Sequence, residues 1–149
     1  MSETRRVLVT GASGLVGAWT TAALCAQPER FRVRVLVRSR DKLAKALAPL
    51  GVGVDALEVA AGDITDPAVV DPLVADADAV LNFAAESHVD RSILDPEAFL
   101  RTGVIGVHVL LEAVRAEAAK DRSVRFLQVS TDEVYGDIPS GWSVETDPL

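Results

Sequence analysis

Three glycines that follow a short apolar run constrain most strongly how this chain can fold. In the stretch VLVTGASGLVGAW, Gly11, Gly14 and Gly17 stand between an apolar run at residues 7–10 and an Ala- and Leu-rich segment at residues 15–26. The run predicts a buried strand, and the segment predicts a helix. A strand, a glycine turn and a helix in this order indicate a dinucleotide-binding unit.

Each glycine has a separate role in such a turn. The first permits the tight turn, the second lets the backbone approach a pyrophosphate, and the third lets helix and strand pack closely. Free N–H groups and the helix dipole then favour an anion at the start of the helix. The alternative is a purely structural turn, but the setting favours cofactor binding. The candidate phosphate-turn residues are Gly11, Gly14, Leu15, Val16 and Gly17.

Strand and helix patterns alternate along the rest of the chain. Further strands are predicted at residues 31–37, 54–60, 79–83 and 124–130, and helices at residues 41–50, with Asp41 as N-cap, and 68–75. A long helix follows Pro96. Its predicted apolar face consists of Leu100, Val104, Val107, Leu111 and Val114, which recur at helical spacing.

This alternation predicts an α/β fold with a Rossmann-like, doubly wound parallel sheet. We expect about five strands in the order 3-2-1-4-5, with the ligand crevice beside the first strand, where the order reverses. The length of 149 residues suits one domain. Residues 1–149 are therefore expected to form a single dinucleotide-binding domain.

Composition argues against several other classes of protein. The net charge is −7, whereas a sequence-independent nucleic-acid binder needs a basic face. The apolar runs are too short to span a bilayer, and the first one stops too early for a signal peptide. Cys25 is the only cysteine, so no intrachain disulfide can form and a cytoplasmic location is the simplest expectation. We expect no metal site and neither a nucleic-acid nor a membrane partner.

The residue at the end of the second strand bears on the choice of nicotinamide cofactor. An acidic residue there would bind the ribose 2′-hydroxyl of NAD, whereas an arginine suits the 2′-phosphate of NADP. The chain has Arg38 at this place, which favours NADP. The alternative is that Arg38 stacks on adenine or faces water. Asp63 and Ile64, after the third strand, are expected to meet the adenine edge.

Two motifs in the second half of the chain carry a family resemblance. NFAAESHVDRSI follows the fourth strand, and VSTDEVYGD follows the fifth. Together with the glycine turn and the long helix, they resemble the extended short-chain dehydrogenases/reductases. Within that family the chain is most similar to the nucleotide-sugar 4,6-dehydratases that act on dTDP-glucose.

The resemblance implies tightly held NAD, with NADP possible because of Arg38, and dTDP-glucose or a related nucleotide sugar as substrate. Such enzymes oxidise glucose at C4, eliminate water across C5 and C6, and return the hydride to C6. By resemblance, Thr131 hydrogen-bonds the C4 oxygen, Asp132 protonates the departing C6 hydroxyl and Glu133 removes the C5 proton. Neighbouring carboxylates can take opposite roles when their surroundings separate their pKa values. The resemblance also implies cofactor contacts from Ala84, Ala85, Ser87 and Thr102.

The chain departs from the family pattern in the redox pair. The family uses a Tyr-x-x-x-Lys pair, but the only tyrosine here is Tyr135, with Pro139 four residues later. Gly103 and Val107 replace an Asn and a Thr that relatives usually carry. We therefore expect a truncated cofactor-binding part that lacks the sugar-nucleotide-binding domain and is inactive alone; a homodimer is expected for a complete relative. The alternatives are a noncatalytic NAD(P)-binding module or redox sensor, and a spliced or designed chain.

Overall fold

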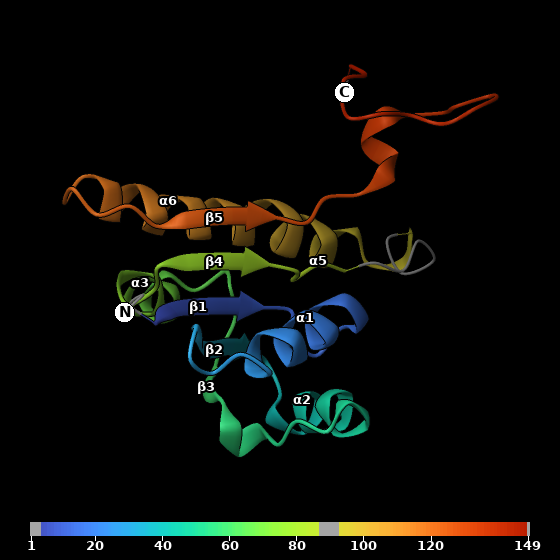
Figure 1. Ribbon diagram of the computed structural model, residues 1–149. Helices are drawn as coiled ribbons and strands as arrows, with labels where there is room; N and C mark the ends of the chain where they lie inside the picture. The colour runs from blue at the N-terminus through green and yellow to red at the C-terminus, as the bar shows by residue number, and fades with distance from the viewer. Residues whose placement is uncertain (1–3, 87–92, 149) are drawn as a thin grey trace.

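A parallel sheet of five strands runs through the computed structural model, which describes residues 4–86 and 93–148. The strand order β3-β2-β1-β4-β5 and the parallel pairing confirm the predicted doubly wound sheet. All carboxyl ends therefore meet at one edge, on the right in Figure 1. The strands are β1 (Arg5–Thr10), β2 (Phe31–Val37), β3 (Glu58–Ala61), β4 (Ala79–Asn82) and β5 (Arg125–Gln128).

Helices cover both faces of the sheet. α1 (Leu15–Cys25) and α2 (Arg40–Leu47) lie on the near face in Figure 1, and α3 (Pro67–Ala75) and α6 (Val107–Ala118) pack together on the far face. The shorter helical segments are η1 (Ala48–Leu50), η2 (Val54–Ala56), α5 (Pro96–Leu100), η3 (Arg101–Gly106) and η4 (Asp132–Tyr135). No helix in the described part of the chain has the length and apolar character needed to cross a bilayer.

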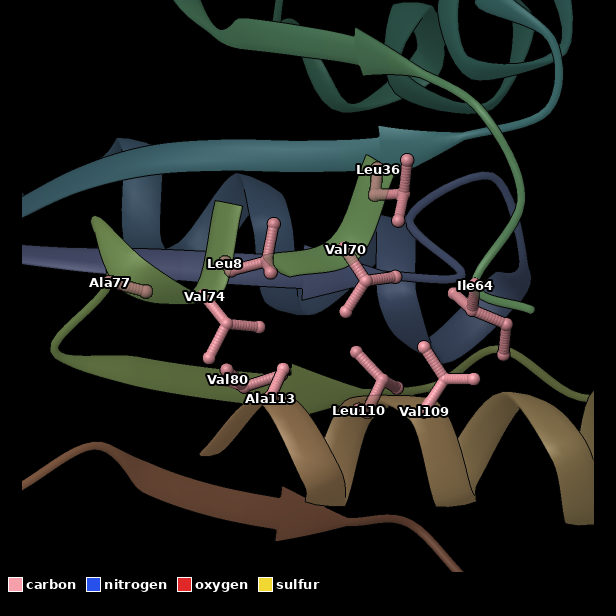
Figure 2. Close-up of a cluster of buried hydrophobic side chains, with 10 residues drawn as sticks. All are labelled: Leu8, Leu36, Ile64, Val70, Val74, Ala77, Val80, Val109, Leu110 and Ala113. Atoms are coloured by element: carbon pink, nitrogen blue, oxygen red, sulfur yellow. The ribbon is translucent and has the colours of Figure 1, made fainter. Parts of the chain in front are cut away.

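The alternation of side chains along β1 and β2 creates two hydrophobic cores. Val7 and Val9 point into the core under α1 and α2, whereas Leu8 between them points into the core under α3 and α6. Successive residues of a strand face opposite sides of a sheet, so both faces of an apolar strand are used. Figure 2 shows the second core, where Leu8 and Val80 of the sheet meet Leu110 of α6.

The start of the third strand and the N-cap of α2 differ from the prediction. The strand predicted at residues 54–60 begins only at Glu58, because Val54–Ala56 form the turn η2. Val54 packs against the first core from this turn, so its apolar side chain does not require a strand. The N-cap of α2 is Ser39, whose hydroxyl accepts the Lys42 N–H at 3.3 Å, and not Asp41. Asp41 lies in the first helical turn, where its charge suits the helix dipole.

The predicted apolar face of the long helix lies mostly outside the core. Val104 and Leu111 are 57% and 45% exposed, whereas Leu110 and Ala113 are buried. The helix is apolar on two sides, so periodicity alone could not select the side that meets the sheet. In addition, Arg101–Gly106 adopts a π-helical conformation, which changes the phase between α5 and α6.

The two adjacent leucines of α6 provide a test of this packing. Leu110→Ala is expected to lower the free energy of unfolding by about 2–5 kcal/mol, because it leaves a cavity beside Val74 and Val80. Leu111→Ala is expected to cost less than about 1 kcal/mol, because Leu111 is half exposed. Urea denaturation of both variants measures the difference. Equal losses would contradict the observed orientation of α6.

Candidate functional site

A pocket of about 190 Å³ lies at the carboxyl edge of the sheet. Its walls come from the glycine turn after β1 and from residues at or just after the ends of β2, β3 and β4. This is the point where the strand order reverses around β1, which is where open α/β sheets bind ligands. The predicted cofactor residues that line the pocket are Gly11, Gly14, Arg38, Asp63, Ile64, Ala84, Ala85 and Thr102.

The remaining predicted cofactor residues do not line it. Leu15 and Val16 open α1 with exposed side chains, and Gly17 is buried beneath the turn. Ser87 lies outside the described residues, as do His88, Asp90 and Arg91 of the same motif. Several further lining residues were not predicted from the sequence. They lie in the glycine turn or beside predicted strand ends, and this position could have identified them. They are Ser13, Leu36, Val37, Gly62 and Phe83.

Direct contact between backbone segments shapes the glycine turn. Gly11 has a φ of +68°, and a Cβ built there would lie 2.4 Å from the carbonyl carbon of Phe83. A Cβ on Gly17 would lie 2.3 Å from the Gly11 carbonyl oxygen. Gly14 donates its N–H to that same oxygen at 2.9 Å and is the N-cap of α1. As a glycine, this N-cap places no side chain over the N–H groups of the first helical turn.

A buried polar network holds the strand ends beneath the pocket. Asn82, at the end of β4, accepts a hydrogen bond from the Thr10 hydroxyl at the end of β1. Its Nδ2 donates to Gln128 Oε1 of β5 at 2.7 Å, and its Oδ1 also accepts the Ala84 N–H at 3.3 Å. Thr10 and Asn82 are fully buried, where polar groups need partners. The network therefore fixes the start of the loop that forms one pocket wall.

Asp63 and Arg38 bring opposite charges to the pocket. Burial alone would raise the pKa of Asp63, but hydrogen bonds from the Thr65 N–H and hydroxyl and the charges of Arg38 and Arg101 lower that pKa below its usual value. Both bonds from Thr65 measure 2.9 Å. Arg38 Nη2 in turn lies 3.0 Å from Glu86 Oε1. Asp63 is thus ionised near neutral pH, and the Arg38 guanidinium is paired with Glu86.

The triplet Thr131–Asp132–Glu133 follows β5 at the same edge, and the described side chains of Thr131 and Glu133 do not line the pocket. Thr131 is the N-cap of η4, and its hydroxyl accepts the Glu133 N–H at 3.3 Å. Thr131 and Glu133 are exposed, while the side chain of Asp132 lies outside the described part. In Figure 1 the chain from η4 onward extends away from the sheet.

A wider hollow of about 1280 Å³ lies at the opposite edge, near the amino ends of the strands. Charged side chains such as Arg5, Asp55 and Glu58 line it. Ligands of open parallel sheets bind at the carboxyl ends, so this hollow is not the candidate site. Among the residues that the structure describes, no group of three or more His, Cys, Asp or Glu could hold a metal ion.

Comparisons with known proteins find 4,6-dehydratases among the matches. The sequence model of the family described as GDP-mannose 4,6 dehydratase matches residues 8–149. A dTDP-glucose 4,6-dehydratase from Mycolicibacterium smegmatis is 44% identical over 138 residues, which cover 89% of this chain and 38% of that protein. The low-salt glycan biosynthesis protein Agl12 from Haloferax volcanii is 46% identical over 149 residues, which cover 96% of this chain and 44% of that protein.

Solved structures of the same kind share the fold. The dTDP-glucose 4,6-dehydratase DesIV from Streptomyces venezuelae, solved with NAD bound, matches with a TM-score of 0.78 and 37% identity. The match covers 97% of this chain and 45% of that chain. A double mutant of DesIV, also with NAD, gives a TM-score of 0.77 and 38% identity. The chain thus spans less than half the length of these relatives.

A methyl group added at the third glycine of the turn tests the backbone contact. Gly17→Ala is expected to lower the free energy of unfolding by more than about 2 kcal/mol, because the turn would have to shift. Gly53→Ala is the matched control, since its Cβ would meet nothing within 4 Å and its φ is −79°. That change is expected to stay within about 1 kcal/mol of the wild type. Chemical denaturation measures both changes. An unchanged free energy of unfolding in Gly17→Ala would contradict the tight contact.

Proposed function

Since the chain belongs to the GDP-mannose 4,6 dehydratase family, we propose that it is the cofactor-binding part of a nucleotide-sugar 4,6-dehydratase that uses NAD. The substrate of the longer protein would be dTDP-glucose or a related nucleotide sugar, as the names of the relatives suggest. The observation that carries the proposal is the pocket at the switch point of the sheet, with the glycine turn as one wall.

The residues of the pocket fit a dinucleotide. Gly14 leaves the N–H groups at the start of α1 uncovered, and an anion there is favoured by the helix dipole. Ala84 and Ala85 have small side chains on the opposite wall, so a flat ring of the cofactor can lie against the backbone there. Asp63, Ile64 and Thr102 complete the wall beyond β3 and at the start of η3. We propose these residues, with the glycine turn, as the cofactor contacts.

When bound, NAD would supply the hydride acceptor for sugar C4 and the hydride donor for C6. The proton of the C4 hydroxyl would pass to a base that the longer protein supplies, because the Tyr-x-x-x-Lys pair is not found in this sequence. The Thr131 hydroxyl hydrogen-bonds the C4 oxygen and so positions the sugar. Glu133 then removes the C5 proton, which the C4 ketone has made acidic, while Asp132 protonates the C6 hydroxyl so that water can leave. Glu133 is exposed on η4, so a substrate can reach it from the solvent.

For the longer protein we also propose a homodimer. α6 buries one face against the sheet, but Val104 of η3 and Leu111 of α6 remain about half exposed. Two-sided apolar helices need a second partner to remove such surface from water. A second copy of the same helix would supply it.

Calorimetric titration of the 149-residue chain with NAD tests the cofactor proposal. We expect saturable binding to one site, because the pocket and the start of α1 are formed within this chain. Gly14→Val is expected to abolish it by placing a branched side chain where the pyrophosphate would lie. Gly53→Val is the control, because Gly53 is remote from the pocket and its Cβ would meet open space. Equal NAD affinity in wild type and Gly14→Val would refute the phosphate turn.

Glu133→Gln tests the elimination step in a longer protein, in which the remainder of the Mycolicibacterium smegmatis relative follows residue 149. Formation of the 4-keto-6-deoxy sugar is expected to slow by about 100-fold or more, with NAD affinity unchanged, because only the base is lost. Asp137→Asn removes an exposed carboxylate nearby and is expected to leave the rate unchanged. Cofactor binding without any activity in the unmutated protein would instead favour a noncatalytic NAD(P)-binding module.

A further inference from the structure

An ion pair joins two loops from opposite sides of the glycine turn. Arg38 directly follows β2, and Glu86 lies in the loop after β4. Their side chains meet at 3.0 Å between Nη2 and Oε1. β1 lies between β2 and β4 in the sheet, so the pair spans the end of β1, where the glycine turn begins. It therefore stands at the mouth of the proposed cofactor pocket, which Arg38 lines.

The two partners differ in how firmly they are held. The Glu86 side chain is only 18% exposed, whereas the Arg38 side chain is 67% exposed. Glu86 is thus the more buried member, and it holds the exposed Arg38 guanidinium across the end of β1. A second carboxylate acts from the other side, because Arg38 is close enough to Asp63 to lower its pKa.

The carboxylates of Glu86 and Asp63 change which cofactor an arginine at this position favours. A free guanidinium at the end of β2 would bind the 2′-phosphate of NADP. Here that phosphate, with a charge of about −1.5 to −2, would have to displace Glu86 and then lie near both Glu86 and Asp63. Like charges at close range disfavour such an arrangement. The ribose of NAD carries a neutral 2′-hydroxyl instead, which meets no such repulsion.

We propose that Glu86 is a specificity-determining residue that withdraws the Arg38 guanidinium from a cofactor 2′-phosphate and so biases the pocket towards NAD. The inference rests on the proposed function, because it concerns the same pocket. It assigns the discrimination to a residue in the loop after β4 rather than to the end of β2 alone. It also explains how an arginine at the end of β2 is compatible with NAD.

The test is a set of titrations of the 149-residue chain with NAD and, separately, with NADP. In Glu86→Gln, the ratio of the NADP Kd to the NAD Kd is expected to fall about fivefold, the upper end of what one exposed ion pair contributes. Glu112→Gln is the matched control: it breaks the Arg115–Glu112 pair on α6, removes the same charge and does not touch the pocket. Its ratio is expected to equal that of the wild type.

Arg38→Gln shows whether the gain in NADP affinity expected in Glu86→Gln depends on the Arg38 guanidinium. Combined with Glu86→Gln, it is expected to cancel the gain in NADP affinity. Alone, it is expected to change NADP affinity less than about twofold, because Glu86 already holds Arg38. This variant keeps the test decisive if Glu86→Gln does not fold, since Arg38 is mostly exposed.

Two results would overturn this inference and leave the proposed function standing. One is an unchanged cofactor ratio in Glu86→Gln while the wild type binds NAD. The other is a loss of NADP affinity of tenfold or more in Arg38→Gln, which would show that the guanidinium reaches the phosphate despite Glu86. A wild-type chain that binds neither cofactor would instead refute the proposed function, and this inference with it.

Discussion

The contact between the backbone of the glycine turn and the end of β4 decides how the rest of the site is built. Gly11 approaches the Phe83 backbone so closely that a Cβ would lie 2.4 Å from it, and Gly17 approaches the Gly11 carbonyl equally closely. No side chain fits between these segments, so α1 begins directly against the strand ends. The N–H groups of its first turn consequently lie beside the pocket, where a helix terminus favours an anion.

Charge at the pocket is governed by pairs rather than by single residues. The rule that an arginine after β2 selects NADP assumes a free guanidinium. In this fold Arg38 is shared between Glu86, at 3.0 Å, and the more distant Asp63, whose pKa it helps to lower. The same logic applies below the pocket, where Asn82 satisfies Thr10, Gln128 and the Ala84 N–H at once. Polar groups there act as bridges between strands that are far apart in the sequence.

The buried side of the long helix could not be predicted from hydrophobic periodicity. Apolar residues occupy two of its sides, so the spacing of Leu111 and Val104 was as regular as that of the residues that became buried. Burial of Leu110 and Ala113 is decided by contact with α3 and the sheet, and the π-helical turn at Arg101–Gly106 resets the phase before α6. The remaining exposed side is the surface to which we assign the proposed homodimer contact.

Features that depend on neighbouring residues could be predicted from the amino-acid sequence. The strand-turn-helix unit at Gly11–Gly17, the alternation that orders the sheet, and pocket residues such as Asp63 and Ile64 all follow from local spacing, because carboxyl ends of parallel strands must share an edge. The Arg38–Glu86 pair, the partners of Asn82 and the buried side of α6 depend on how the folded chain packs. These join segments tens of residues apart, and no local pattern encodes which of several possible partners packing will bring into reach.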